Sequence, residues 1–347
     1  MNSDQDSADT PSVPAQHISQ DAALTQDPSL AQEIGARSYC SALAHAEGAV
    51  LIGTADPVDV WLLLEYSAVW RARAVNDNSL SPAVNDWLKN AVPAIESALG
   101  CKARLLFIRQ TAALPGAKKN VQGAEKKLFV VRSGERDGAV SAVDLPDYDT
   151  LLALDPVALA RGPAESARER TPAVAFDQPL YLVCTNGQRD LCCARFGLPV
   201  YEQLAQQYGG SVWQTTHVGG HRYAPNLICL PEGVVYGFAD TAVAPALVQA
   251  TRNADLQLEH LRGRSCYSAV GQVAELAVRQ HFGELRLRAL RLLGEQRLEP
   301  GRWRLSFEVA GRGRMQVQVR ELAPMLVQAS CGDAGSKQVN QYAAELV

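Results

Sequence analysis

Several common signals are missing from this chain of 347 residues, and each absence narrows the choice of function. Residues 1–36 contain no Lys or Arg, and no apolar run approaches the length of a membrane span. We therefore expect a cytoplasmic protein with no secretory signal and no contact with a membrane. The chain also lacks a Gly-x-Gly-x-x-Gly after a strand and a phosphate-binding Gly-rich loop ending in Lys-Ser/Thr, so nothing supports a bound nicotinamide or nucleotide.

The charge is low and unevenly distributed. The net charge is −4, with 33 basic and 37 acidic residues, and residues 36 onward are nearly neutral. A nucleic-acid-binding protein needs a basic excess or stripe, so we expect no such partner. The hydrophobic fraction of 47% is ordinary for a globular protein with a buried core. The acidic residues of the first 36 positions are Asp4, Asp6, Asp9, Asp21, Asp27 and Glu33.

Composition and periodicity divide the chain into four parts. Residues 1–35 are expected to be a disordered acidic leader, and 36–160 an α+β unit. Residues 175–255 predict a thioredoxin-like domain, and 256–347 a helical and β extension that packs on the others. The predicted fold class is α/β, with an α+β organisation overall.

The α+β unit is predicted from apolar spacing and turn residues. Apolar side chains recur at helical spacing over Ser81–Leu99, and Gly100 follows as a stop signal. Residues 110–126 predict an exposed loop, and 161–177 a linker. The strand or buried apolar candidates are Ala49–Gly53, Val58–Glu65, Ala103–Arg109, Lys127–Arg132 and Ala139–Leu145.

The domain at 175–255 has a more specific pattern. A short apolar strand, Leu180–Val183, ends on Cys184, and Ser211–Thr216 is a second strand that ends on His217. A helix is expected between them at Pro199–Tyr208, with Pro199 in its first turn. Two more strands, Leu227–Leu230 and Val234–Phe238, and a helix after Asp240 complete the thioredoxin-like order. Because a crossover helix makes the first two strands parallel, both Cys184 and His217 should lie at one edge of the sheet.

The C-terminal extension is expected to be helical first and then β. Leu256–Leu261 and Tyr267–Phe282 predict helices. Three strands follow, at Trp303–Val309, Met315–Glu321 and Met325–Ser330, and Gly311-Arg-Gly313 joins the first two.

Two cysteines and two histidines offer soft ligands in two short loops. Cys184 is followed by Cys193 after eight residues, and His217 by His221 after three. Thiolates and imidazoles together suit zinc or a Rieske-like iron–sulfur cluster. Spacing alone leaves Cys192 and Cys193 as equal candidates for the second sulfur. The other cysteines are expected to be small buried hydrophobic residues: Cys40, Cys101, Cys229, Cys266 and Cys331.

Residues beside these ligands could orient them or tune the charge of the site. Gly219 and Gly220 favour a loop that approaches a bulky centre closely. Asp190 could accept a hydrogen bond from a ligand histidine, although a simple turn role is favoured. Arg189 and Arg222 could tune the charge of the site or bind an acidic electron donor, and solvated surface arginines are an equal alternative. Cys192 is a further second-shell candidate.

The stretch from Tyr181 to Ala239 resembles the sucrase/ferredoxin-like family, thioredoxin-like ferredoxins related to the fungal actin-patch-distal protein. The shared pattern is Cys, eight residues, Cys, a spacer, and His-x-Gly-Gly-His, present here as Cys184, Cys193 and 217–221. The match selects Cys193 over Cys192. Further family-like segments are Ile52-Gly53-Thr54-Ala55, Leu62–Trp70 and Gly263-Arg264-Ser265, so the resemblance extends over most of the chain.

The resemblance implies a [2Fe–2S] cluster held by Cys184, Cys193, His217 and His221, with one-electron transfer coupled to proton uptake. It indicates an electron carrier rather than an enzyme with its own substrate, and a redox partner such as a flavin-dependent reductase. Two alternatives remain open. The four residues could close a redox-silent zinc site, or Cys192 and Cys193 could serve thiol-redox chemistry.

Overall fold

The computed structural model describes residues 39–111, 125–162 and 172–347. The expected leader, residues 112–124 of the expected loop and residues 163–171 of the expected linker lie outside these ranges. Among the described helices, none has both the length and the apolar character needed to span a bilayer.

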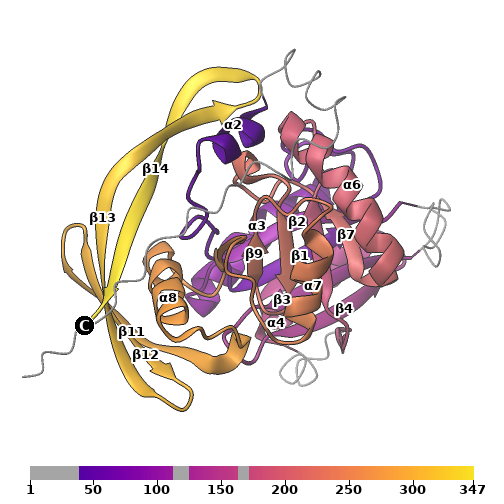
Figure 1. Cartoon of the computed structure of the whole chain (residues 1–347). Coiled ribbons are helices and arrows are strands. Elements are labelled where there is room, and N and C mark those ends of the chain that lie inside the picture. The colour runs from indigo at the N-terminus through magenta and orange to yellow at the C-terminus, as the bar shows by residue number, and fades with distance from the viewer. Residues whose placement is uncertain (1–38, 112–124, 163–171) are drawn as a thin grey trace, which may run out of the picture. The chain divides into compact units, whose positions relative to one another are not determined.

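A ten-stranded mixed sheet runs through the two halves that the sequence separates (Figure 1). Its strand order is β10-β9-β8-β6-β7-β2-β1-β3-β4-β5, and the antiparallel pair β2–β7 joins the halves. The α/β fold class is thereby confirmed. The strands are β1 Val60–Glu65, β2 Ala103–Arg109, β3 Lys126–Arg132, β4 Ala139–Leu145, β5 Val174–Ala175, β6 Leu180–Cys184, β7 Val212–Thr215, β8 Leu227–Leu230, β9 Val234–Tyr236 and β10 Leu261–Arg264.

The first half follows its sequence pattern closely. Helix α3, Pro82–Leu99, begins where the Ser81 side chain accepts a hydrogen bond from the Val84 N–H, and it ends at Gly100 in the left-handed conformation. Side chains alternate along β1: Leu62 and Leu64 pack in the cluster that contains α3, whereas Trp61 and Leu63 face the opposite cluster. Residues 49–53 form no strand. The other helices of this half are α2, Cys40–Ala46, and α4, Pro156–Arg161, with a 3-10 helix η1 at Asp149–Ala153.

The thioredoxin-like order predicted for 175–255 is present. Strands β6 and β7 are parallel, and β8 and β9 add to β6 in antiparallel fashion. Helix α7 is Ala244–Arg252. The crossover helix α6 is longer than predicted, because it runs from Leu191 to Tyr208 and contains Pro199 in its interior. Pro199 is exposed, so water can replace the backbone hydrogen bond that proline removes.

The C-terminal residues form a second, four-stranded antiparallel sheet with helix α8, Ala269–Phe282, packed against it. The predicted helix at 256–261 is wrong, because Leu261 begins β10 at the edge of the large sheet. The two strands predicted at 315–321 and 325–330 are one strand with a register shift between Leu322 and Met325. The strands are β11 Leu290–Glu299, β12 Arg302–Val309, β13 Gly313–Ser330 and β14 Asp333–Leu346.

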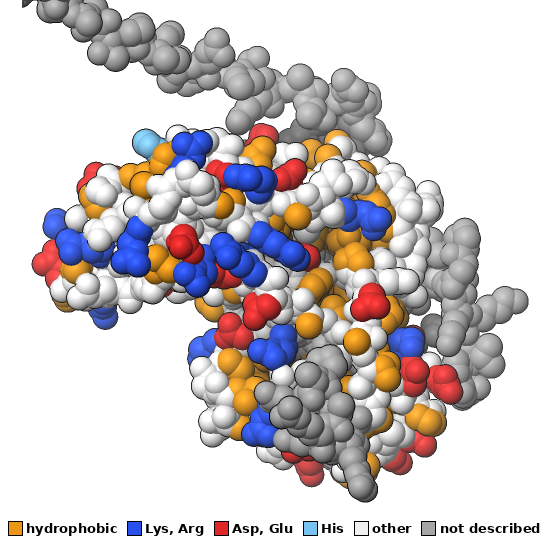
Figure 2. Space-filling model, turned by 90° about the horizontal axis from the view of Figure 1, so that it is seen from below, with side chains coloured by type: hydrophobic (Ala, Val, Ile, Leu, Met, Phe, Trp, Pro, Cys, Tyr) orange, Lys and Arg blue, Asp and Glu red, His pale blue; other side chains and the backbone are white. Residues whose placement is uncertain are grey.

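Basic and acidic side chains alternate on the exposed surface of this second sheet. Arg291 pairs with Glu308 and Arg302 with Glu299, all four substantially exposed. Figure 2 shows one face on which Lys and Arg side chains are numerous and have acidic side chains among them. Exposed pairs of this kind contribute little stability, about 0–1 kcal/mol each.

A buried ion trio links α8 to β10, and we expect it to be sensitive to substitution. Glu275 Oε1 lies 2.9 Å from Arg279 Nη2 and 3.6 Å from Arg264 Nη1, and all three side chains are fully buried. Replacing Glu275 by Gln leaves two buried guanidinium groups without a counter-charge, which should cost about 3–5 kcal/mol of unfolding free energy. Urea denaturation measures the loss. Glu308→Gln is the exposed control and should change stability by less than about 1 kcal/mol; equal losses in both variants would contradict the prediction.

Candidate metal centre

Two parallel strands bring Cys184 and His217 to one edge of the large sheet. Cys184 is the last residue of β6 and pairs in register with Thr215, the last residue of β7, and His217 follows two residues later. The backbone N–H of Thr185 donates to the Thr215 carbonyl at 3.2 Å, which keeps the strands together up to their ends. The carboxyl edge of parallel strands is where α/β proteins usually build their sites.

Cys193 reaches this edge from the first turn of α6, not from a loop. Asp190 caps the helix: its side chain accepts a hydrogen bond from the Cys192 N–H at 3.0 Å, and its carbonyl accepts one from the Cys193 N–H at 3.0 Å. Consecutive helical residues point in different directions, so Cys192 and Cys193 cannot face the same centre. Cys193 packs with Cys184 in one buried cluster, and Cys192 packs with Cys40 in another.

Three of the four predicted ligands converge. The Sγ atoms of Cys184 and Cys193 and a ring nitrogen of His217 all lie within 4.8 Å of one another. Cys193 Sγ is 3.8 Å from His217 Nδ1. Both cysteines are buried, and His217 is half-buried. The Cys193 thiol and the His217 ring hold the pKa of Cys184 well below its ordinary value, while Cys184 and burial raise the pKa of Cys193.

His221 lies beside this trio, with one ring nitrogen bonded and the other without a partner. It is the first residue of the 3-10 helix η3, His221–Tyr223, and its ring centroid is 5.5 Å from that of His217. Nε2 donates to the carbonyl of Ala329 at 2.7 Å, whereas Nδ1 is buried and has no hydrogen-bond partner. Burial lowers the pKa of His221, which favours the neutral ring that metals bind. A buried nitrogen without a hydrogen-bond partner is available to coordinate a metal as a fourth ligand.

Gly219 and Gly220 allow the loop between the histidines to turn tightly. Both have positive φ angles, +85° and +66°. A side chain at Gly220 would collide with the guanidinium of Arg262, which is itself buried. Arg262 Nη1 donates to the carbonyl of Gly219 at 3.3 Å and to Asn226 Oδ1 at 2.7 Å. The fully buried Arg262 therefore stabilises the loop between His217 and His221, a role that the sequence did not reveal.

Gly197 sets the distance between α6 and the end of β6. A Cβ at this position would collide with the carbonyl oxygen of Cys184, a backbone atom that cannot rotate away. We expect Gly197→Ala to push α6 from the strand, to cost about 1–3 kcal/mol and to reduce metal content. Thermal unfolding and metal analysis of the purified variant test this. Gly210→Ala, where a Cβ meets nothing within 4 Å, is the control; an unchanged metal content in Gly197→Ala would contradict the prediction.

The residues predicted to lie beside the ligands are not all placed as expected. Asp190 Oδ2 is 3.7 Å from His221 Nε2, too long for the predicted hydrogen bond, and the Ala329 carbonyl takes that place. Arg222 is buried, so it is not a solvated surface residue. Arg189 is exposed and lies in a hollow of about 520 Å³ next to His217 and Asn186.

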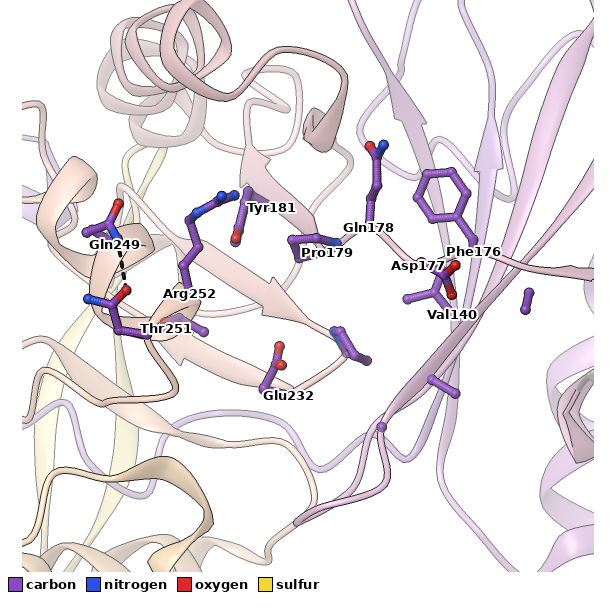
Figure 3. A pocket seen from close by; sticks show the side chains of 15 residues that line it. Val140, Phe176, Asp177, Gln178, Pro179, Tyr181, Glu232, Gln249, Thr251 and Arg252 are labelled. Atoms are coloured by element: carbon purple, nitrogen blue, oxygen red, sulfur yellow. Dashed lines mark hydrogen bonds between the residues drawn. The ribbon is translucent and has the colours of Figure 1, made fainter.

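A larger hollow of about 610 Å³ lies elsewhere and includes none of the predicted ligands. Figure 3 shows Glu232 and Arg252 beside it, near Tyr181. Tyr181 is in the amino-terminal part of β6, three residues before Cys184. Burial raises the pKa of Glu232. Of these two hollows, only the smaller one is lined by a candidate metal ligand, His217.

Two buried thiols and two imidazoles at the carboxyl edge of a thioredoxin-like sheet define an α/β protein with a candidate Cys/His metal centre. A family model described as sucrase/ferredoxin-like matches residues 51–263, more than half of the chain, and the chain therefore belongs to this family. The match includes all four predicted ligands and excludes Cys40 and Ala329. No curated protein and no solved structure matches the chain.

Proposed function

We propose that this protein is a one-electron carrier that binds a [2Fe–2S] cluster through Cys184, Cys193, His217 and His221. The observation that carries the proposal is the donor set: two buried thiols and the His217 ring converge, and the unpartnered Nδ1 of His221 lies alongside. A bound [2Fe–2S] cluster supplies one-electron chemistry, and imidazole ligands raise its potential above that of an all-cysteine ferredoxin.

The spacing of the donors favours a dinuclear centre over a single zinc ion. One tetrahedral ion needs all four ligand atoms in one compact group. Cys184, Cys193 and His217 form such a group, with all atoms within 4.8 Å, and His221 is not part of it. A centre with two irons would accommodate a His221 that lies outside the compact group of the other three ligands. The two cysteines would then bind one iron and the two histidines the other, as in Rieske centres.

The hollow at His217 supports exchange of electrons with a partner protein. His217 is half-buried, whereas Cys184 and Cys193 are inaccessible, so an electron would enter or leave at the histidine side. Exposed Arg189 lines the same hollow, together with Arg73 and Lys89. Basic side chains at the entrance suit a redox partner with an acidic surface, such as a flavin-dependent reductase.

Spectroscopy on anaerobically purified protein tests the proposal. A [2Fe–2S] protein is coloured, contains about two irons and two sulfides per chain, and becomes paramagnetic when it accepts one electron. A colourless protein with zinc at this site would instead establish the redox-silent alternative. Thiol-redox chemistry of Cys192 with Cys193 has less support, because the two buried side chains belong to different clusters.

A further inference from the structure

Three thiols and a carboxylate form a second cluster that the function proposed above does not use. The Sγ atom of Cys192 lies 3.6 Å from that of Cys40 and 3.0 Å from that of Cys331, and Cys331 Sγ lies 3.6 Å from Cys40 Sγ. Asp190 completes the group, with its oxygens 3.9 and 4.0 Å from Cys40 Sγ. All four ligand atoms lie within 4.8 Å of one another.

Three segments far apart in sequence build this cluster. Cys40 begins α2, Cys192 lies in the first turn of α6, and Cys331 lies in the turn of the β13–β14 hairpin. Figure 1 shows the end of this long hairpin, drawn in yellow, next to α2. Cys40 is buried in an apolar cluster and Cys229 in an apolar core, as expected, whereas Cys331 is only partly buried; beyond that expectation, the thiols of Cys40 and Cys331 contact each other and Cys192.

Backbone groups point at the sulfurs and the carboxylate as they do around anionic ligands. The N–H of Cys40 donates to Cys331 Sγ and the N–H of Ser41 to Cys192 Sγ, both at 3.4 Å. The N–H of Cys331 donates to Asp190 Oδ2 at 3.1 Å. Cys40, Cys192 and Asp190 are at most 5% exposed. Hydrogen bonds of this kind orient ligands and stabilise their charged forms.

We propose that Cys40, Cys192, Cys331 and Asp190 bind one divalent cation of the zinc class. Zinc–sulfur bonds of about 2.3 Å in a tetrahedral site separate neighbouring sulfurs by about 3.8 Å. Two of the three sulfur pairs are at 3.6 Å, so the ligands need only small shifts to enclose an ion. Each carboxylate oxygen has two lone pairs, so Asp190 can coordinate the ion while it keeps its hydrogen bonds to backbone N–H groups.

The composition of the cluster distinguishes this site from the alternatives. A disulfide between Cys192 and Cys331 would use two sulfurs and leave the thiol of Cys40 against the buried carboxylate of Asp190 without a cation. The donor set also differs from the two cysteines and two histidines of a Rieske-like cluster, because it has three thiols, one carboxylate and no imidazole. A single soft cation satisfies three thiolates and one carboxylate together.

A metal at this site would also help to hold His221, a proposed ligand of the first centre, in position. Ala329, whose carbonyl accepts the hydrogen bond from His221 Nε2, lies two residues before Cys331 on the same hairpin. Binding at Cys331 would hold that carbonyl in place. The inference does not depend on the proposed function, because the two sites share no ligand.

Elemental analysis of the full chain, purified with reductant from zinc-supplied cells, tests the proposal. We expect one zinc per chain that survives dialysis, and Cys40→Ser and Cys331→Ser should each lose at least nine-tenths of it. Their iron content should stay near that of the wild type. Cys101→Ser, a half-buried thiol outside both clusters, is the matched control. Zinc retention in both serine variants would overturn the proposal.

Thiol labelling keeps the test independent of how well the variants fold. In the native wild-type protein, Cys40 and Cys331 should react with an alkylating reagent at least about tenfold faster once a zinc chelator is added, while Cys101 keeps its rate. In protein purified without reductant from the same zinc-supplied cells, a Cys192–Cys331 disulfide detected by mass spectrometry would contradict the proposal. Zinc at this site in a colourless protein would support it, even though the electron-carrier function would then fail.

Discussion

Replacing Cys193 by serine should remove the iron of the proposed [2Fe–2S] cluster, and replacing its neighbour Cys192 by serine should not. This is the expected result because the two side chains of one helical turn face different clusters. Cys193 Sγ lies within 4.8 Å of the Cys184 sulfur and a His217 ring nitrogen, whereas Cys192 Sγ is 3.6 Å from Cys40 Sγ. We expect the Cys193 variant to keep less than about a tenth of its iron and to unfold at a lower temperature, since metal binding stabilises the folded state.

Iron and sulfide assays on anaerobically purified variants provide the measurement. Cys184→Ser should behave like Cys193→Ser, and Cys229→Ser, buried in an apolar core away from both clusters, is the control. The zinc content should follow the opposite pattern, with loss in the Cys192 variant and retention in the Cys193 variant. Full iron occupancy in both Cys184→Ser and Cys193→Ser would contradict the ligand assignment.

Local patterns were sufficient to predict the ends of the strands that carry Cys184 and His217. An apolar run ends at Cys184 and a run of strand-forming residues ends just before His217, and the helix between them makes the strands parallel. The choice between Cys192 and Cys193 could not be made from spacing. It depends on where α6 begins, and the Asp190 cap, nine residues before the expected start, was hidden by the proline signal at Pro199.

The cluster of Cys40, Asp190, Cys192 and Cys331 could not be predicted from local sequence patterns. Cys40 and Cys331 are 291 residues apart and meet only because the β13–β14 hairpin returns over α2. The sequence divided β13 at Pro324, whereas the structure continues the strand with a register shift between Leu322 and Met325. Proline is tolerated in a strand at such irregularities. The sequence analysis placed no strand at Asp333–Leu346, so it gave no hairpin whose turn could carry Cys331 to Cys40 and Cys192.

The two histidines should differ in how their replacement changes the redox potential and its dependence on pH. His217→Cys and His221→Cys each exchange a neutral ligand for a thiolate, so each variant that keeps the cluster should have a potential lower by about 100 mV or more. His221 Nε2–H donates to the Ala329 carbonyl and is 3.7 Å from the Asp190 carboxylate, so losing that proton would place negative charge against two oxygens. The His217 ring borders a hollow lined by Arg189, and no Asp or Glu is among the described residues that line it, so the His217 proton is the one we expect to leave the oxidised centre.

Protein-film voltammetry across a range of pH separates the two rings. As pH rises through the range in which the oxidised centre loses a proton, the wild-type potential should fall by about 59 mV per pH unit, the value for one proton per electron. His221→Cys should keep that slope and His217→Cys should lose it, while His281→Gln, at an exposed position on α8, should match the wild type. A slope that persists in His217→Cys and disappears in His221→Cys would assign the proton to the buried ring instead. A wild-type potential that stays constant from mildly acidic to strongly alkaline pH would refute proton coupling altogether.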